Sequence, residues 1–216
     1  MNKKRIIFIG DSITESGKFD DPEQIGTGYV RLLHDYLKTS YPSDRLELIN
    51  KGISGNRIND LASRWKTDVI DLNPDIISVS IGINDVWRQL DNPSMEQIYP
   101  EEFEQIYDDL LAQVKANTNA VIVLMEPTVI EENVESVGNE KLKPYVEITN
   151  RLAKKYDAII VSTHQAFINY LSVNNEYELT TDGVHMNSAG NMLMATTWLG
   201  ATKLFLDEEF ERYGVK

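Results

Sequence analysis

The stretch Ile6-Ile7-Phe8-Ile9-Gly10-Asp11-Ser12-Ile13-Thr14, close to the N-terminus, decides how the rest of the chain is organised. Its run of four apolar residues is typical of a buried strand and is too short for a helix. Gly10 ends that strand where a sharp turn needs a residue without a Cβ. We therefore expect the strand to deliver Ser12 to its carboxyl end, which is where open parallel sheets bind ligands. The alternative is an ordinary turn, because Asp and Ser side chains often bond nearby amides and cap helices.

Strand-like and helix-like segments alternate along the remaining sequence. Short apolar runs predict further strands, and segments with helical spacing of apolar residues predict helices. This alternation is typical of βαβ units, so we expect an α/β fold: a doubly wound, five-stranded parallel sheet in a three-layer α/β/α sandwich, forming a single domain over 1–216. The expected strands after the first are 46–49, 75–81, 120–125 and 158–161, and the expected helices are 28–40, 59–72 (capped by Asn59-Asp60), 101–117, 141–156 and 188–206. The segments 15–27, 86–100 and 127–139 are predicted to be polar loops.

Composition narrows the class of protein. Hydrophobic residues make up 42% and charged residues 25% of the 216 residues, which is typical of a globular protein. The formal net charge of -13 argues against nucleic acid as a partner, because affinity for phosphates depends on Lys and Arg. No stretch approaches the ~20 apolar residues that span a bilayer. The basic start Lys3-Lys4-Arg5 is followed by too short an apolar run for a signal peptide, so we expect a cytoplasmic protein without a membrane partner.

The absence of cysteine leaves oxygen and imidazole groups to carry any chemistry. A serine is a weak nucleophile until a base accepts its proton, and His185 is the candidate base for Ser12. Asp182, three residues before His185, is the candidate partner that orients the imidazole. The backbone N–H groups of Ser12 and Gly55 and the side-chain amide of Asn84 are candidate donors to a carbonyl oxygen that becomes negative during acyl transfer.

Each of these residues also has a simpler explanation. Asp182-Gly183 is a common turn, Gly55 suits a turn after a strand, and Asn84 suits a helix cap. Other chemistries lack their motifs, since there is no His-Glu-x-x-His, Walker A or Gly-x-Gly-x-x-Gly pattern, and we expect neither a metal nor a cofactor. The remaining histidines, His34 and His164, are predicted to be structural. The acidic residues of 127–139 are predicted to form a solvated loop face; they are Glu131, Glu132 and Glu135.

Four blocks together resemble those of the SGNH hydrolases, also called the GDSL lipase/esterase family. They are Gly-Asp-Ser at 10–12, Gly-Ile-Ser-Gly-Asn at 52–56, Gly-Ile-Asn-Asp at 82–85 and Asp-Gly-Val-His at 182–185. The second and third blocks look most like those of the bacterial acetylxylan esterase branch. The resemblance implies Ser12 as nucleophile, His185 as base and Asp182 as its partner. It also implies an oxyanion hole of Ser12, Gly55 and Asn84, a flavodoxin-like sheet, and assembly into a homo-oligomer.

From these observations we expect a serine esterase that removes short acyl groups, acetyl in particular, from carbohydrates such as xylo-oligosaccharides. The same machinery would serve a lysophospholipase or thioesterase, and a flavodoxin-like binding module without catalysis is a third possibility. Trp87 and Arg88, close behind Asn84, are candidate substrate contacts together with Asp11, because an aromatic ring at the mouth of a site can stack on a sugar. The nucleophile elbow Gly-x-Ser-x-Gly of the α/β-hydrolases is absent.

Overall fold

A five-stranded parallel sheet forms the centre of the protein. The computed structural model describes residues 3–173 and 176–210, and its strands follow the order β2-β1-β3-β4-β5. This is the flavodoxin-like order that the resemblance of the four sequence blocks implies. The strands are β1 (Lys4–Gly10), β2 (Leu46–Gly52), β3 (Ile76–Ser80), β4 (Val121–Met125) and β5 (Ile159–Val161).

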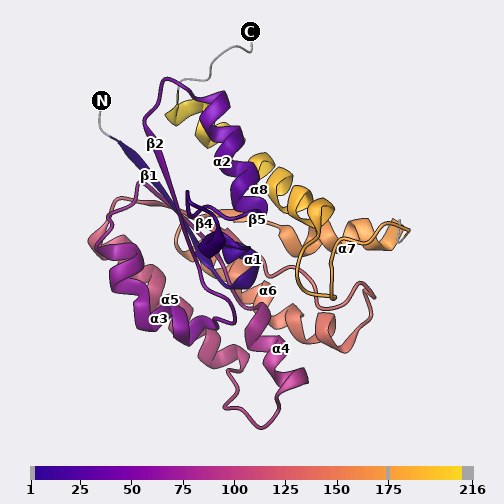
Figure 1. Cartoon of the computed structure of the whole chain (residues 1–216). Coiled ribbons are helices and arrows are strands. Elements are labelled where there is room, and N and C mark those ends of the chain that lie inside the picture. Colours follow the sequence, from indigo (N-terminus) through magenta and orange to yellow (C-terminus); the bar gives the residue numbers. More distant parts are fainter. Residues whose placement is uncertain (1–2, 174–175, 211–216) are drawn as a thin grey trace.

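Helices cover both faces of this sheet (Figure 1). On one face α2 (Tyr29–Ser40) packs against α8 (Ser188–Glu209), with α7 (Thr163–Val173) beside α8. On the other face α5 (Pro100–Asn117) packs between α3 (Ile58–Trp65) and α6 (Val137–Lys155). The remaining elements are short: α1 (Ser12–Glu15), a 3-10 turn η1 (Lys18–Asp20), a π-helical turn η2 (Lys66–Ile70) and α4 (Ile83–Asp91).

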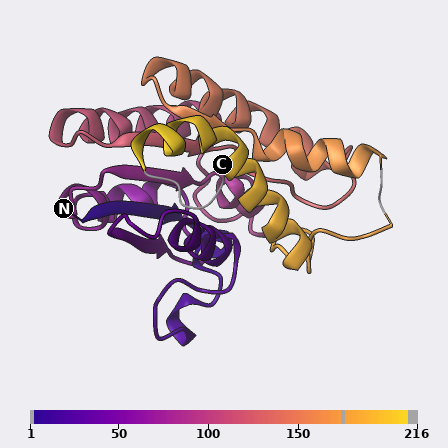
Figure 2. The same ribbon diagram turned by 90° about the horizontal axis from the view of Figure 1, so that it is seen from above.

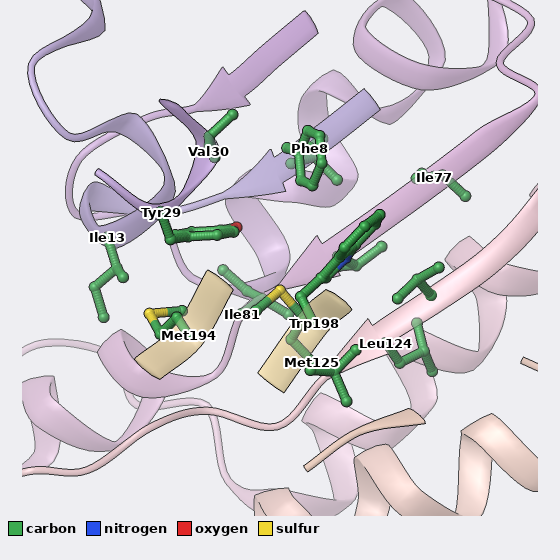
Figure 3. Close-up of a cluster of buried hydrophobic side chains, with 14 of the residues drawn as sticks. Phe8, Ile13, Tyr29, Val30, Ile77, Ile81, Leu124, Met125, Met194 and Trp198 are labelled. Carbon is green, nitrogen blue, oxygen red and sulfur yellow. The ribbon is translucent and has the colours of Figure 1, made fainter. Parts of the chain in front are cut away.

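Aromatic and aliphatic side chains fill the layer between the sheet and the α2–α8 face (Figure 3). The centroid of the Phe8 ring lies 5.6 Å from that of the Trp198 ring and 6.3 Å from that of the Tyr29 ring. Trp198 also donates its Nε1 proton to Ser78 Oγ at 3.0 Å, so the buried indole has a polar partner. This packing fixes α8 on β1 and β3, and it places the N-terminal end of α8 on the side where β1 ends (Figure 2).

The carboxyl ends of all five strands are level with one another. Gly10 is in register with both Gly52 and Ser80, and Met125 is in register with Ser80 and Val161. A Cβ at Gly10 would lie 2.3 Å from the Ser80 carbonyl oxygen, so only glycine allows β1 to end this close to β3. The loops that follow the strands therefore start from a single edge of the sheet.

The structure also corrects several boundaries. Residues 86–91, expected in a polar loop, belong to α4, which spans 83–91, and residues 163–173 form α7, where no helix is predicted. Helix α6 begins at Val137 instead of at residue 141. Asn59 is not a cap: α3 begins after Arg57, and Asp60 accepts the Arg57 N–H at 2.8 Å from inside the first turn. Among the described helices, none is long and apolar enough to cross a membrane.

Candidate active site

Ser12 begins the one-turn helix α1 directly after β1. Asp11 is the N-cap of α1, and its Oδ1 accepts the N–H of Ile13 at 2.9 Å. This cap stabilises a sharp turn at the sheet edge, so that the Ser12 side chain does not have to lie in the core. Ser12 Oγ lies 2.8 Å from His185 Nε2, within hydrogen-bond distance.

His185 and Asp182 lie on one tight turn before α8. Gly183, between them, has a φ of +89°, a conformation that favours glycine. Asp182 Oδ1 accepts the backbone N–H groups of His185 at 2.7 Å and Val184 at 3.0 Å, and its Oδ2 lies 2.6 Å from His185 Nδ1. Partial burial alone would raise the pKa of Asp182, but the hydrogen bonds from the His185 backbone, the imidazole and Val184 outweigh it and lower that pKa.

Gly55 and Asn84 lie near this pair at the same edge. Gly55 has a φ of +78°, and a Cβ there would meet nothing within 4 Å. Its N–H, like that of Ser12, is bonded to no acceptor in the part of the chain that the structure describes. The Asn84 amide nitrogen donates to the carbonyl oxygen of Asn56 at 3.1 Å, which fixes the side chain and leaves its second proton available. The arrangement combines a serine hydroxyl, an imidazole within hydrogen-bond distance of it and three N–H donors of the kind that can stabilise an oxyanion.

A pocket of about 310 Å³ opens beside the Ser12–His185 pair. Hydroxyl and carboxylate groups contribute much of its wall, and Ser54 Oγ donates to Glu15 Oε2 at 2.7 Å there. Its lining residues include Ser12, Glu15, Thr27, Ser54, His185 and Met186. A pocket of this size suits a small polar molecule next to the serine.

A model of the GDSL-like Lipase/Acylhydrolase family matches residues 8–193. The chain belongs to this family. The acetylxylan esterase of Geobacillus stearothermophilus is 36% identical to it over 203 residues, which cover 91% of this chain and 92% of that protein. These findings make the protein a carboxylic ester hydrolase, and they confirm the resemblance drawn from the four sequence blocks.

Solved structures agree with this assignment. A mutant of an acetyl-xylooligosaccharide esterase from Geobacillus superposes with a TM-score of 0.86 at 35% identity, covering 93% of this chain and 95% of that one. An α/β hydrolase enzyme from the metagenome of Lake Arreo, Spain, has the same TM-score and coverage at 37% identity. The three-layer fold of this GDSL-like hydrolase is therefore that of known esterases.

Trp87 and Arg88 of α4 are the two other predicted substrate contacts, and Trp87 lies against His185. The Trp87 and His185 rings are steeply inclined to each other, at an interplanar angle of 69°, with ring centroids 5.7 Å apart. The Arg88 guanidinium lies 4.8 Å from the centre of the Trp87 ring and forms an ion pair with Asp91. Trp87 therefore packs against His185, and Arg88 packs against Trp87.

Two carboxyl groups lie buried beneath the site. Asp11 is 2% exposed and Asp85 is fully buried, and burial raises the pKa of each to about 7 against the pull of backbone N–H donors. Asp85 accepts the N–H of Ile58 through Oδ1 at 3.2 Å, while its Oδ2 has no partner among the described residues. Asp11 was expected to contact substrate; its position instead suits support of the turn that carries Ser12.

The other histidines lie away from this site. His34 pairs with Asp35 on α2, and His164 Nδ1 lies 2.5 Å from the Thr128 carbonyl oxygen in a buried contact. Within 3–173 and 176–210 no group of three or more His, Asp or Glu side chains could hold a metal ion.

One acidic residue has a different place from the one expected. Glu131 and Glu135 are exposed, but Glu132 is only partly exposed and bonds to residues 179 and 180 of the loop that carries Asp182 and His185. The prediction that all three acids form a solvated face is therefore wrong for Glu132. The sequence gives no signal for this contact, because its partners are 47 and 48 residues away.

Proposed function

We propose that this hydrolase removes short acyl groups, acetyl in particular, from carbohydrate esters such as xylo-oligosaccharides. The observation that carries the proposal is the continuous hydrogen-bonded line from Ser12 Oγ through His185 to Asp182, at 2.8 and 2.6 Å. The carbohydrate part of the proposal follows the names of the relatives and is consistent with the polar pocket beside Ser12.

In the acylation step, His185 Nε2 accepts the proton of Ser12 Oγ while that oxygen attacks the ester carbonyl carbon. The carbonyl oxygen becomes an oxyanion and is held by the N–H groups of Ser12 and Gly55 and by the Asn84 amide. Asp182 stays ionised and stabilises the imidazolium, in keeping with its lowered pKa. The tetrahedral intermediate then breaks its bond to the alcohol oxygen, which takes the proton from His185.

Deacylation repeats these steps with water. His185 accepts a proton from a water molecule, the water oxygen attacks the acyl-enzyme, and the carboxylic acid leaves as Ser12 Oγ regains its proton. The same three residue types are named in relatives: the Geobacillus acetylxylan esterase is solved as catalytic mutants in which a serine, an aspartate or a histidine becomes alanine. There too the aspartate is three positions before the histidine.

Hydrolysis of p-nitrophenyl acetate by the wild type and by Ser12→Ala tests the assignment. We expect kcat to fall by several orders of magnitude in the variant, because a triad acts as a unit. Equal rates at equal folded fraction would contradict the nucleophile. Rates over p-nitrophenyl esters of increasing chain length then test the acyl group: a maximum at acetate supports the proposal. A maximum at long chains would favour the lysophospholipase or thioesterase alternative.

A further inference from the structure

Internal hydrogen bonds of Asp182 fix the shape of the turn that carries Asp182 and His185, but they do not fix where that turn lies relative to Ser12. This turn is the tip of a short hairpin, closed by Thr181 N–H to the His185 carbonyl at 2.8 Å and by Asn187 N–H to the Leu179 carbonyl at 2.9 Å. In the proposed mechanism the imidazole must stay aligned with Ser12 while its charge changes. Contacts between the hairpin and the rest of the protein therefore affect how well the imidazole is aligned with Ser12.

Glu132 supplies the main outside contact. Its Oε1 accepts three hydrogen bonds from the base of the hairpin: Leu179 N–H at 2.8 Å, Thr180 N–H at 2.7 Å and the Thr180 hydroxyl at 2.6 Å. Because the single hydroxyl proton of Thr180 points at Glu132, its oxygen is free to accept, and it accepts the N–H of Gly183 at 3.2 Å. Glu132 thus connects through Thr180 to the residue between Asp182 and His185.

The segment that carries Glu132 is itself held in place. Glu131 N–H donates to the Gly183 carbonyl at 2.8 Å, so the same segment contacts the tip of the hairpin from a second side. Asn139 of α6 accepts the Ile130 N–H at 2.9 Å and donates to the Asn133 carbonyl at 2.8 Å, and Ser136 Oγ donates to the Ile130 carbonyl at 2.6 Å. The contact between Glu132 and the hairpin therefore links the hairpin to the N-terminal end of α6.

We propose that Glu132 is a positioning residue for catalysis: through Thr180 and Gly183 it holds the Asp182–His185 turn in register with Ser12. This inference rests on the proposed roles of Ser12, Asp182 and His185. Glu132 does not touch the reacting atoms. It acts on how well His185 is aligned, and misplacing a catalytic group by about 1 Å can cost roughly 100-fold in rate.

The test compares Glu132→Ala and Glu132→Gln with Glu135→Ala and Glu135→Gln, using p-nitrophenyl acetate. Glu135 lies in the same segment with an exposed side chain, so its variants make the same change in charge without touching the hairpin. We expect Glu132→Ala to lower kcat by about 10- to 100-fold with KM little changed. Glu132→Gln keeps an acceptor oxygen and should recover most of that loss, whereas the Glu135 variants should match the wild type.

Thr180 provides an independent arm in case Glu132→Ala folds poorly. Thr180→Val removes the connecting hydroxyl at nearly constant shape and should lower kcat, whereas Thr180→Ser keeps the hydroxyl and should not. The double variant Glu132→Ala/Thr180→Val should lose little more than the worse single variant, because both act through one connection. The inference is overturned if Thr180→Val keeps wild-type kcat, if the losses multiply, or if Glu132→Ala equals Glu135→Ala at equal folded fraction. Loss of activity in Ser12→Ala with any of these outcomes would leave the esterase mechanism intact.

Discussion

Asn84 has two amide protons, and only one of them is donated to a partner among the described residues. That proton goes to the Asn56 carbonyl at 3.1 Å, and the side chain is 1% exposed. A buried amide with an unused donor costs free energy unless a ligand pairs with it. Placed beside Ser12 and Gly55, the second proton suits a substrate oxygen that becomes negative in the transition state.

Replacing Asn84 by Ala should therefore lower kcat for p-nitrophenyl acetate by about 100- to 1000-fold, as the loss of one oxyanion donor does in other acyl-transfer sites. The effect should appear in kcat more than in KM, because the bond strengthens as charge develops. Asn92→Ala, at the exposed end of the same helix, is the matched control. Unchanged kcat in folded Asn84→Ala would show that Asn84 only packs against the turn at Asn56.

At the scale of elements, glycine decides how tightly β1 can approach its neighbours. A Cβ at Gly10 would lie 2.3 Å from the Ser80 carbonyl oxygen and 2.5 Å from Thr14 Oγ1. Gly200 on α8 has nothing within 4 Å of an added Cβ and is exposed. The same substitution at these two positions should therefore have opposite effects.

Gly10→Ala should destabilise the protein by about 1–3 kcal/mol, the usual cost of forcing atoms into a packed region. Gly200→Ala should stabilise it by about 0.5–1 kcal/mol, because Ala loses less conformational freedom in a helix. Urea unfolding followed by circular dichroism measures both. A Gly10→Ala protein as stable as wild type would mean that β1 and β3 can separate at their carboxyl ends without cost.

Most of the elements that could be predicted from the sequence have a clear apolar period. The strands and the helices α2, α3 and α6 meet that condition, whereas the long helix α8 does not. Helix α4 does not show a clear apolar period, because two of its buried positions are occupied by the polar residues Asn84 and Asp85. Helix α7 does carry a helical signal in its sequence, since Thr163, Phe167 and Leu171 are buried at a spacing of four, although no helix is predicted there.

The candidate site could also be predicted from the sequence only in part. The residues of the four sequence blocks lie together because parallel strands end at one edge, a general property of the fold. The Glu132 contact joins loops far apart in the sequence, and no local pattern encodes it.

The protein as a whole combines a formal net charge of -13 with the two carboxyl groups buried beneath the candidate site, Asp11 and Asp85. Repulsion among surface carboxylates opposes the compact state more strongly as pH rises. The buried groups act in the same direction. Desolvation raises the pKa of Asp85 from 3.8 to about 7, so the native state holds its proton more tightly than the unfolded chain does.

The sign of the resulting pH dependence follows from that difference. The contribution of Asp85 to the free energy of unfolding is fully present below about pH 4, where both states are protonated, and is lost as pH rises through about 7. Asp85→Asn keeps an acceptor for the Ile58 N–H and removes the titration. The loss of stability between pH 5 and pH 8 should shrink by about 1–3 kcal/mol in this variant. Asp109→Asn, at an exposed position of α5, changes the charge equally and should leave that loss unchanged. Urea unfolding at the two pH values measures the difference, and equal losses in Asp85→Asn and wild type would show that Asp85 is ionised in the native protein throughout this range.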